Sequence, residues 1–126
     1  EDPSKRIMPT TKPACSKDDI IRIRELCRSV FCDDRLIQAA VSLTTKTRRH
    51  RGVELGVSPR GSLMLVKALK AYALIKGRDY VIDQDIVDIS PVVLAHRIKV
   101  KDMRIFPKQL IRELAVSEVG KISHSA

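Results

Sequence analysis

The sequence predicts an all-α fold: a small bundle of four or five helices with at most one short strand pair. Apolar residues recur at helical spacing in several segments, and residues typical of helix starts and ends separate those segments. Of the 126 residues 44% are hydrophobic and 3% aromatic, with no Trp, so the core must consist of Leu, Ile, Val and Ala. This length is that of one domain with a single core.

The longest apolar run predicts a central helix with both ends marked. Ser58 stands at the N-cap, where its hydroxyl can accept from an N–H group of the first turn, and Pro59 stands at the first helical position, where its missing N–H costs nothing. Gly77 suits the left-handed position after the last turn. Apolar side chains leave chiefly Lys67 and Lys70 for solvent. We therefore expect this helix to be packed on several sides.

Two further helices are expected before the central one. Ser16 and Asp19 have the spacing of a capping box, and an amphipathic pattern follows over about 17–29. Asp33 or Asp34 then caps a second helix.

After Gly77 the sequence predicts two shorter helices. Asp83 resembles an N-cap with Asp85 in the first turn, and this helix restarts at Ser90-Pro91 toward His96. Pro107 marks the start of a last short helix.

Two β-prone trios, 30–32 and 80–82, could form one short strand pair.

Arg60 is a cation in the first turn of a helix, where the partial positive charge of free N–H groups disfavours it by up to about 1 kcal/mol. The placement makes sense if an anion binds there. Free N–H groups and a guanidinium together suit a phosphate, which Arg can hold with two parallel hydrogen bonds. The alternative is a solvated surface arginine, and the spacing alone does not decide between the two.

The chain is basic, with a formal net charge of +9 and a pI of about 9.8. Charge of this kind suits nucleic acid, acidic proteins, anionic lipid or nucleotide phosphates. Four cations gather near the expected end of the second helix at His50; they are Lys46, Arg48, Arg49 and Arg51. Their placement matches the negative end of the helix dipole, and a nucleic-acid patch is the alternative.

The sequence indicates neither a disulfide framework nor a metal site. Cys15, Cys27 and Cys32 are odd in number and form no CxxC pair, so we interpret them as reduced thiols of a cytosolic protein. His96 has no catalytic partner of recognisable spacing nearby. No apolar run approaches the 18 residues of a membrane span.

Four motifs in order give the segment from Gly52 to Ile98 a family resemblance. GVSPR at 56–60, the apolar helix, GRDYV at 77–81 and VLAHRI at 93–98 resemble the C-terminal helical lid of MoxR-type ATPases of the AAA+ superfamily. The resemblance implies that Arg60 is the sensor-2 residue, which reaches from the lid to the γ-phosphate of ATP, and that Ser58 and Pro59 lie beside it at the nucleotide.

The resemblance also implies partners. It implies an ATPase core domain of the same chain, neighbouring subunits of a ring, expected to be a hexamer, and client proteins that the assembly remodels in a chaperone-like way. On this view residues 1–16 are a linker from the core, 17–98 are the lid, and 99–126 are a C-terminal extension with a tail more basic than the family leads one to expect.

ATP hydrolysis requires a P-loop, GxxxxGK[ST], and an acidic residue that holds Mg²⁺. The five glycines form no such pattern, so we expect this chain alone to be inactive and to bind no cofactor alone. The resemblance assigns the P-loop and the Mg²⁺ site to a core that precedes Glu1.

The alternative function is a free-standing basic helical module in which helix 59–76 or the 46–51 cluster binds nucleic acid. The apolar character of the helix and the scarcity of aromatic residues disfavour it.

Overall fold

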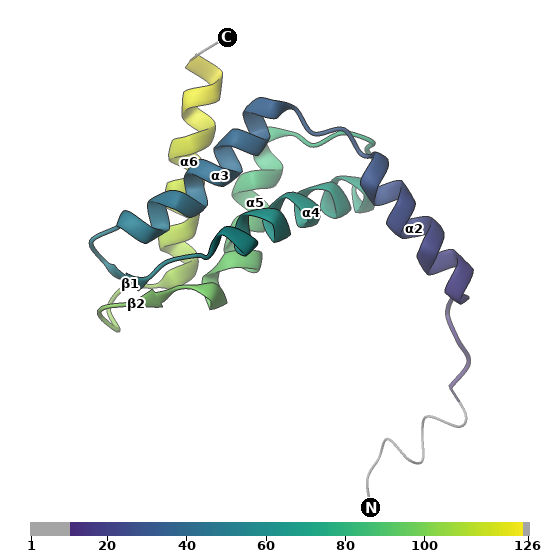
Figure 1. Cartoon of the computed structure of the whole chain (residues 1–126), viewed down its shortest axis with the longest axis horizontal. Coiled ribbons are helices and arrows are strands. Elements are labelled where there is room, and N and C mark those ends of the chain that lie inside the picture. Colours follow the sequence, from purple (N-terminus) through teal and green to yellow (C-terminus); the bar gives the residue numbers. More distant parts are fainter. Residues whose placement is uncertain (1–10, 125–126) are drawn as a thin grey trace, which may run out of the picture.

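The computed structural model describes residues 11–124, and this range holds five α-helices, four of which pack around one core (Figure 1). The helices are α2 (Lys17–Ser29), α3 (Asp34–Arg49), α4 (Pro59–Ile75), α5 (Asp83–Leu94) and α6 (Pro107–His124), and a 3-10 turn, η2 (Ala95–Arg97), follows α5. The strands β1 (Val53–Leu55) and β2 (Lys99–Val100) form one antiparallel pair. The predicted all-α class with a short strand pair is confirmed.

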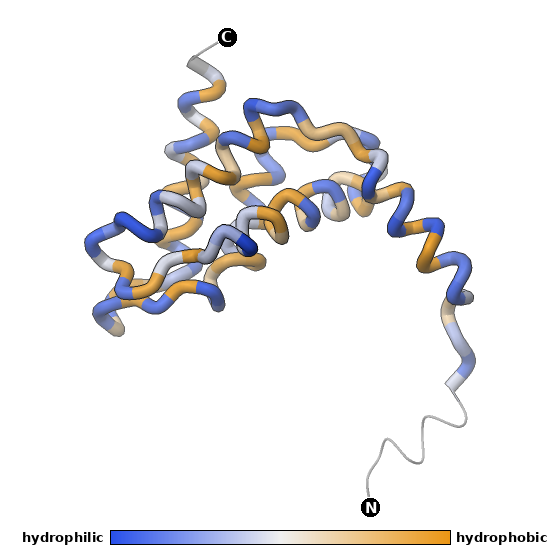
Figure 2. Tube along the Cα trace, in the orientation of Figure 1, coloured by the Kyte–Doolittle hydropathy of each residue, from blue (hydrophilic) through white to orange (hydrophobic). Residues whose placement is uncertain are grey.

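The core is aliphatic, as the composition requires. Its fully buried large side chains are Leu43, Leu65, Leu69, Ile86, Leu94, Ile111, Val30 and Val57. None of the four aromatic residues is buried. The helices α3 to α6 supply most of this core, while α2 stands away from the bundle although it carries apolar residues (Figures 1 and 2).

The helix α2 has the predicted capping box. The backbone N–H of Asp19 donates to Ser16 Oγ at 3.1 Å, and the N–H of Ser16 donates to Asp19 Oδ2 at 2.9 Å. No residue of α2 is buried, so its apolar face lies open within the described chain. It contacts the end of α4, where Lys70 Nζ donates to the carbonyl of Arg28 at 3.2 Å.

The helix α4 begins and ends where the sequence predicts, but it is less enclosed than expected. Gly77 has φ +77°, and its N–H and that of Arg78 donate to the carbonyls of Leu74 and Ala73, which closes the helix with a Schellman motif. Leu63 and Ile75, by contrast, are 66% and 80% exposed. The helix does pack against α2, α3 and α5, but the expectation that chiefly Lys67 and Lys70 face solvent is wrong, because α3 and α5 cover one face and α2 reaches one end.

A buried ion pair fixes the turn between α4 and α5. Arg78 donates to both carboxylate oxygens of Asp85, at 2.9 and 2.7 Å, and Asp85 is 2% exposed. The same carboxylate accepts the backbone N–H of Ile82 at 2.9 Å. Ile82 therefore occupies the N-cap position, and the prediction of Asp83 as the N-cap is wrong by one residue.

Two further predictions need correction. The helix α5 runs through Pro91 to Leu94 and does not restart at Ser90-Pro91, because its buried face is held between α4 and α6. The predicted pairing of 30–32 with 80–82 is reduced to one bridge, between Phe31 and Tyr80. The strand pair itself is made by β1 and β2.

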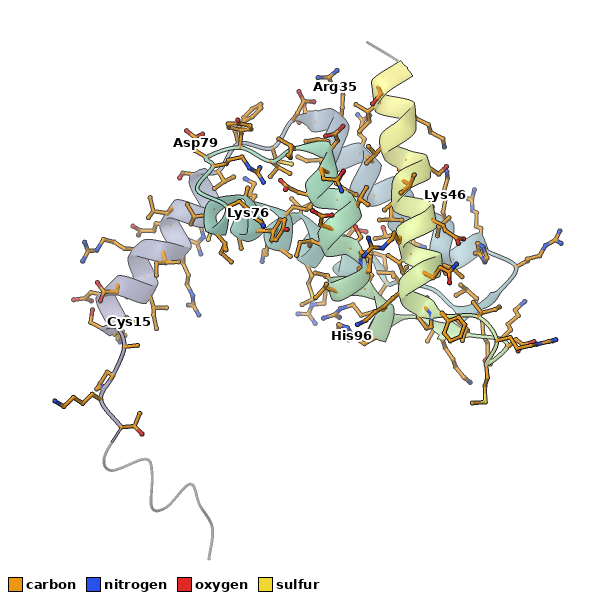
Figure 3. All side chains as sticks on the ribbon, turned by 180° about the vertical axis from the view of Figure 1, so that it is seen from behind. Cys15, Arg35, Lys46, Lys76, Asp79 and His96 are labelled. Atoms are coloured by element: carbon orange, nitrogen blue, oxygen red, sulfur yellow. The ribbon has the colours of Figure 1, made fainter. Side chains whose placement is uncertain are left out.

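The helix α6 begins at Pro107, as predicted, but its 18 residues make it longer than the short helix expected. Leu110, Ile111 and Ala115 are buried between α3 and α5. Glu118 is 4% exposed and forms an ion pair with Lys46 of α3 (Figure 3).

The acid stability of the bundle should depend on Glu118. Burial pushes the pKa of this carboxyl upward, but hydrogen bonds from Lys46, Ser42 and Lys121 outweigh burial and leave its pKa below the ordinary value. A carboxyl whose pKa is lowered on folding stabilises the fold at pH values above its pKa in the unfolded chain, which is about 4.3. This stability is lost as the pH falls through the pKa in the folded chain. In thermal unfolding, Glu118→Gln should lower Tm at pH 7, and the difference from wild type should shrink below about pH 4. A difference that is independent of pH would contradict this role.

Candidate functional site

The candidate site lies where β1 leads into α4, and α3 anchors the connecting segment. Val57 is fully buried, and its N–H donates to Thr47 Oγ1 at 2.9 Å. The carbonyl of Val57 accepts from Arg48 Nη1 at 2.7 Å. Both backbone polar groups of this buried residue are thus satisfied by side chains of α3.

Two glycines allow this close approach. A Cβ on Gly56 would lie 2.6 Å from the backbone of Arg48, and a Cβ on Gly61 would lie 2.2 Å from Val57 Cγ1. In the first turn of α4, next to Gly61, Ser62 Oγ lies 2.5 Å from Thr44 Oγ1. The segment around Ser58 is therefore held to α3 on both sides.

Between these anchors Ser58, Pro59 and Arg60 are exposed. Ser58 occupies the N-cap, as predicted, but its hydroxyl makes no capping bond, so that part of the prediction is wrong. The N–H of Gly61, one of the two groups from which such a hydroxyl can accept, donates instead to the carbonyl of Ser58 at 2.8 Å. The Ser58 hydroxyl is left for another partner.

The Arg60 guanidinium makes no hydrogen bond or ion pair with any residue in the range 11–124 that the structure describes. Arg60 belongs to the first turn of α4, which holds no acidic residue. The groups presented at this helix N-terminus are a guanidinium and a hydroxyl, and they match the oxygens of a phosphate. The three residues that the sequence singled out are consecutive in the chain, and all three are exposed at this point.

The four cations near the end of α3 do not form one continuous exposed basic surface. Lys46 pairs with Glu118, and Arg48 donates to Val57 and to Thr45 Oγ1. Arg49 and Arg51 are exposed. Half of the cluster is therefore engaged in the fold, which weakens the case for a nucleic-acid patch.

The remaining candidate residues do not form a site. His96 is exposed at one edge of the bundle (Figure 3). Within residues 11–124, no three His, Cys, Asp or Glu side chains gather closely enough to hold a metal ion. The cysteines are free thiols, with Cys15 exposed and Cys32 buried. No helix of this range is long and apolar enough to cross a membrane.

Sequence reasoning missed the anchoring residues Thr44, Thr47 and Arg48. A signal was present, because β-branched hydroxyl residues are unfavourable in helix interiors unless their side chains have a hydrogen-bonding role. Three threonines in the last turns of α3 are such a concentration.

Comparison with known proteins identifies the fold. A family model described as the AAA lid domain matches residues 45–116. This match covers more than half of the chain, which therefore belongs to the AAA lid family.

Relatives place the chain within that family. It is 38% identical over 121 residues to YeaC of Bacillus subtilis, an uncharacterized protein, and 34% identical over 99 residues to the chaperone MoxR1 of Mycobacterium tuberculosis. These alignments cover 93% and 71% of the chain. A crystal structure of a proposed ATPase from Cytophaga hutchinsonii matches 79% of the chain with a TM-score of 0.71 and 26% identity. The chain is thus a lid domain of the MoxR type of AAA+ protein.

The relatives are longer than this chain. It spans 38% of YeaC, 26% of MoxR1 and 34% of the Cytophaga protein.

The anchoring of Val57 predicts a contrast between two hydroxyl residues. Thr47→Val removes the acceptor of a buried N–H and should lower the free energy of unfolding by about 1–3 kcal/mol. Ser58→Ala should lower it by less than about 0.5 kcal/mol, because no capping bond is lost. Urea unfolding of both variants measures the two values. A loss at Ser58 equal to that at Thr47 would show that the hydroxyl of Ser58 caps α4 in solution.

Proposed function

We propose that this chain is the lid of a MoxR-type ATPase and that Arg60 is its sensor-2 residue. One observation carries the proposal: Arg60 is exposed and unpaired within the described chain, at the N-terminus of a helix whose position is fixed by α3. The family membership of the chain supports the assignment.

The proposed mechanism rests on how the chain holds Arg60. Bound ATP, with Mg²⁺ held by a core domain, supplies the phosphoryl group that is transferred to water. The Arg60 guanidinium donates to oxygens of the terminal phosphate, and the Ser58 hydroxyl adds a donor at the same point. Because these groups stabilise charge that develops during transfer, they favour the transition state over the resting nucleotide.

Because α4 is anchored to α3, a contact between Arg60 and the phosphate can move the whole lid. Val57, Thr47 and Arg48 tie the N-terminus of α4 to α3, and α3 packs on α6. Movement of Arg60 toward or away from phosphate therefore displaces the whole bundle as one body. A lid that binds the triphosphate state better than the product state changes its position when ATP is hydrolysed.

The same proposal extends to the full-length protein that contains this lid, which we call the parent protein. The parent protein is a cytoplasmic ATPase that assembles into a ring, with six subunits as the expected number. It uses lid movement to remodel or assemble client proteins, and its core domain and neighbouring subunits are the lid's partners. The name of the mycobacterial relative, a chaperone, supports this direction.

ATP turnover of Arg60 variants of the full-length protein tests the sensor-2 assignment. Arg60→Ala should lower ATP turnover by about 10-fold to 10³-fold, equivalent to about 1.4–4 kcal/mol of transition-state stabilisation. Arg60→Lys should recover little, because an ammonium lacks the planar fork of donors. Steady-state turnover and nucleotide affinity are the measurements, with Arg112→Ala as the matched loss of an exposed arginine on α6. Unchanged turnover and affinity in Arg60→Ala would overturn the sensor-2 assignment while leaving the lid fold intact.

Arg78 provides the complementary control. Removing it leaves the buried carboxylate of Asp85 without its cation, so Arg78→Ala should lower the stability of the fold. Turnover per folded molecule should change less than in Arg60→Ala. Thermal unfolding and turnover, measured on the same preparation, separate the two effects.

A further inference from the structure

The exposed aromatic residues of the chain lie at two opposite ends of the bundle. Phe31 and Tyr80 are 64% and 49% exposed, at the end where α2 meets α4. Phe106 is 66% exposed, in the segment that joins β2 to α6 at the far end (Figure 1). Exposed aromatic side chains are characteristic of protein–protein interfaces, so both ends are candidates for contact.

The first end is a hollow with an acidic rim. Phe31, Tyr80 and Ile82 give it apolar walls, and its open volume is about 660 Å³. Three carboxylates and one guanidinium line it, namely those of Asp33, Asp79, Asp83 and Arg35. We call this surface the acidic hollow; Asp79 marks it in Figure 3.

The negative charge of the acidic hollow is only partly neutralised by cations of the same chain. Arg35 pairs with Asp33 at 3.1 Å, whereas Asp79 and Asp83 form no ion pair within the part of the chain that the structure describes. In a chain of net charge +9, an apolar hollow with a negative rim suits a partner segment that is both basic and apolar.

The second end carries such a segment. In residues 101–108, which we call the basic tip, Met103 is 96% exposed beside the exposed Phe106. Lys101, Arg104 and Lys108 flank these side chains, and Asp102, bonded to Arg104, is the one carboxylate. The tip therefore presents apolar anchors between cations.

We propose that the basic tip of one copy docks into the acidic hollow of a second copy. A chain cannot join its own two surfaces, because they lie at opposite ends of the bundle (Figure 1). The contact joins unlike surfaces, so it is head to tail and propagates to further copies. It is independent of Arg60 and of the proposed nucleotide contact.

Charge reversal at each surface tests the proposal on the 126-residue chain with its cysteines reduced. The hollow variant combines Asp79→Lys with Asp83→Lys, and the tip variant combines Lys101→Glu with Lys108→Glu. A control reverses Lys17 and Lys67, two exposed cations outside both surfaces. Circular dichroism verifies that each variant is folded.

Sedimentation equilibrium at up to about 0.5 mM chain detects contacts with Kd up to about 1 mM. The average mass of wild type and control should rise with concentration, and it should rise less at high salt because the rims are charged. Each variant alone should remain a monomer. Their equimolar mixture should associate again, because the intact tip of one variant meets the intact hollow of the other and the two reversed surfaces also carry opposite charges.

Three results would overturn the proposal. They are a wild-type chain that stays monomeric throughout, a hollow or tip variant that associates as wild type does, and a mixture of the two variants that stays monomeric.

Discussion

The rest of this lid depends on the backbone of Val57, whose N–H and carbonyl both have hydrogen-bond partners. Val57 is fully buried, and an unpaired N–H at this depth would cost about 1–3 kcal/mol. Thr47 and Arg48 satisfy these two groups, and the glycine at 56 lets the strand come close enough for them to do so. Through these contacts the end of α3 fixes the start of α4, and with it the direction in which Arg60 leaves the bundle.

This constraint explains why the residues of GVSPR differ so much in burial. Val57 is enclosed, while the next three residues are exposed. A rigid support beneath an open group is what a contact with an external phosphate requires, because a donor that must be ordered on binding loses free energy. The second fixed point, Arg78 with Asp85, holds the opposite end of α4 and the start of α5. The central helix is thus fastened at both ends by polar contacts and along one face by the core.

Local signals explain what the sequence could predict. The Ser16–Asp19 capping box and Gly77 act within a few residues of themselves, so the boundaries of α2 and α4 followed from spacing alone. Arg60 could also be singled out, because a cation in a first helical turn is locally unfavourable.

The predictions that failed depend on distant partners. The pairing of β1 with β2 joins segments more than forty residues apart, and neither is long enough to show a pattern of its own. Ser58 could not be excluded as a side-chain cap without knowing that its carbonyl takes the N–H of Gly61. The exposure of Leu63 depends on which helices lie against α4, and hydrophobicity does not encode that.

The central claim concerns the position of Arg60, and a structure of the full-length protein with a non-hydrolysable ATP analogue tests it most directly. The account predicts that the guanidinium of Arg60 lies about 2.7–3.2 Å from an oxygen of the terminal phosphate when the lid is closed. It also predicts that the hydrogen bonds of Val57 to Thr47 and Arg48 persist in that state. A closed lid in which no phosphate oxygen lies within about 6 Å of Arg60 would contradict the account.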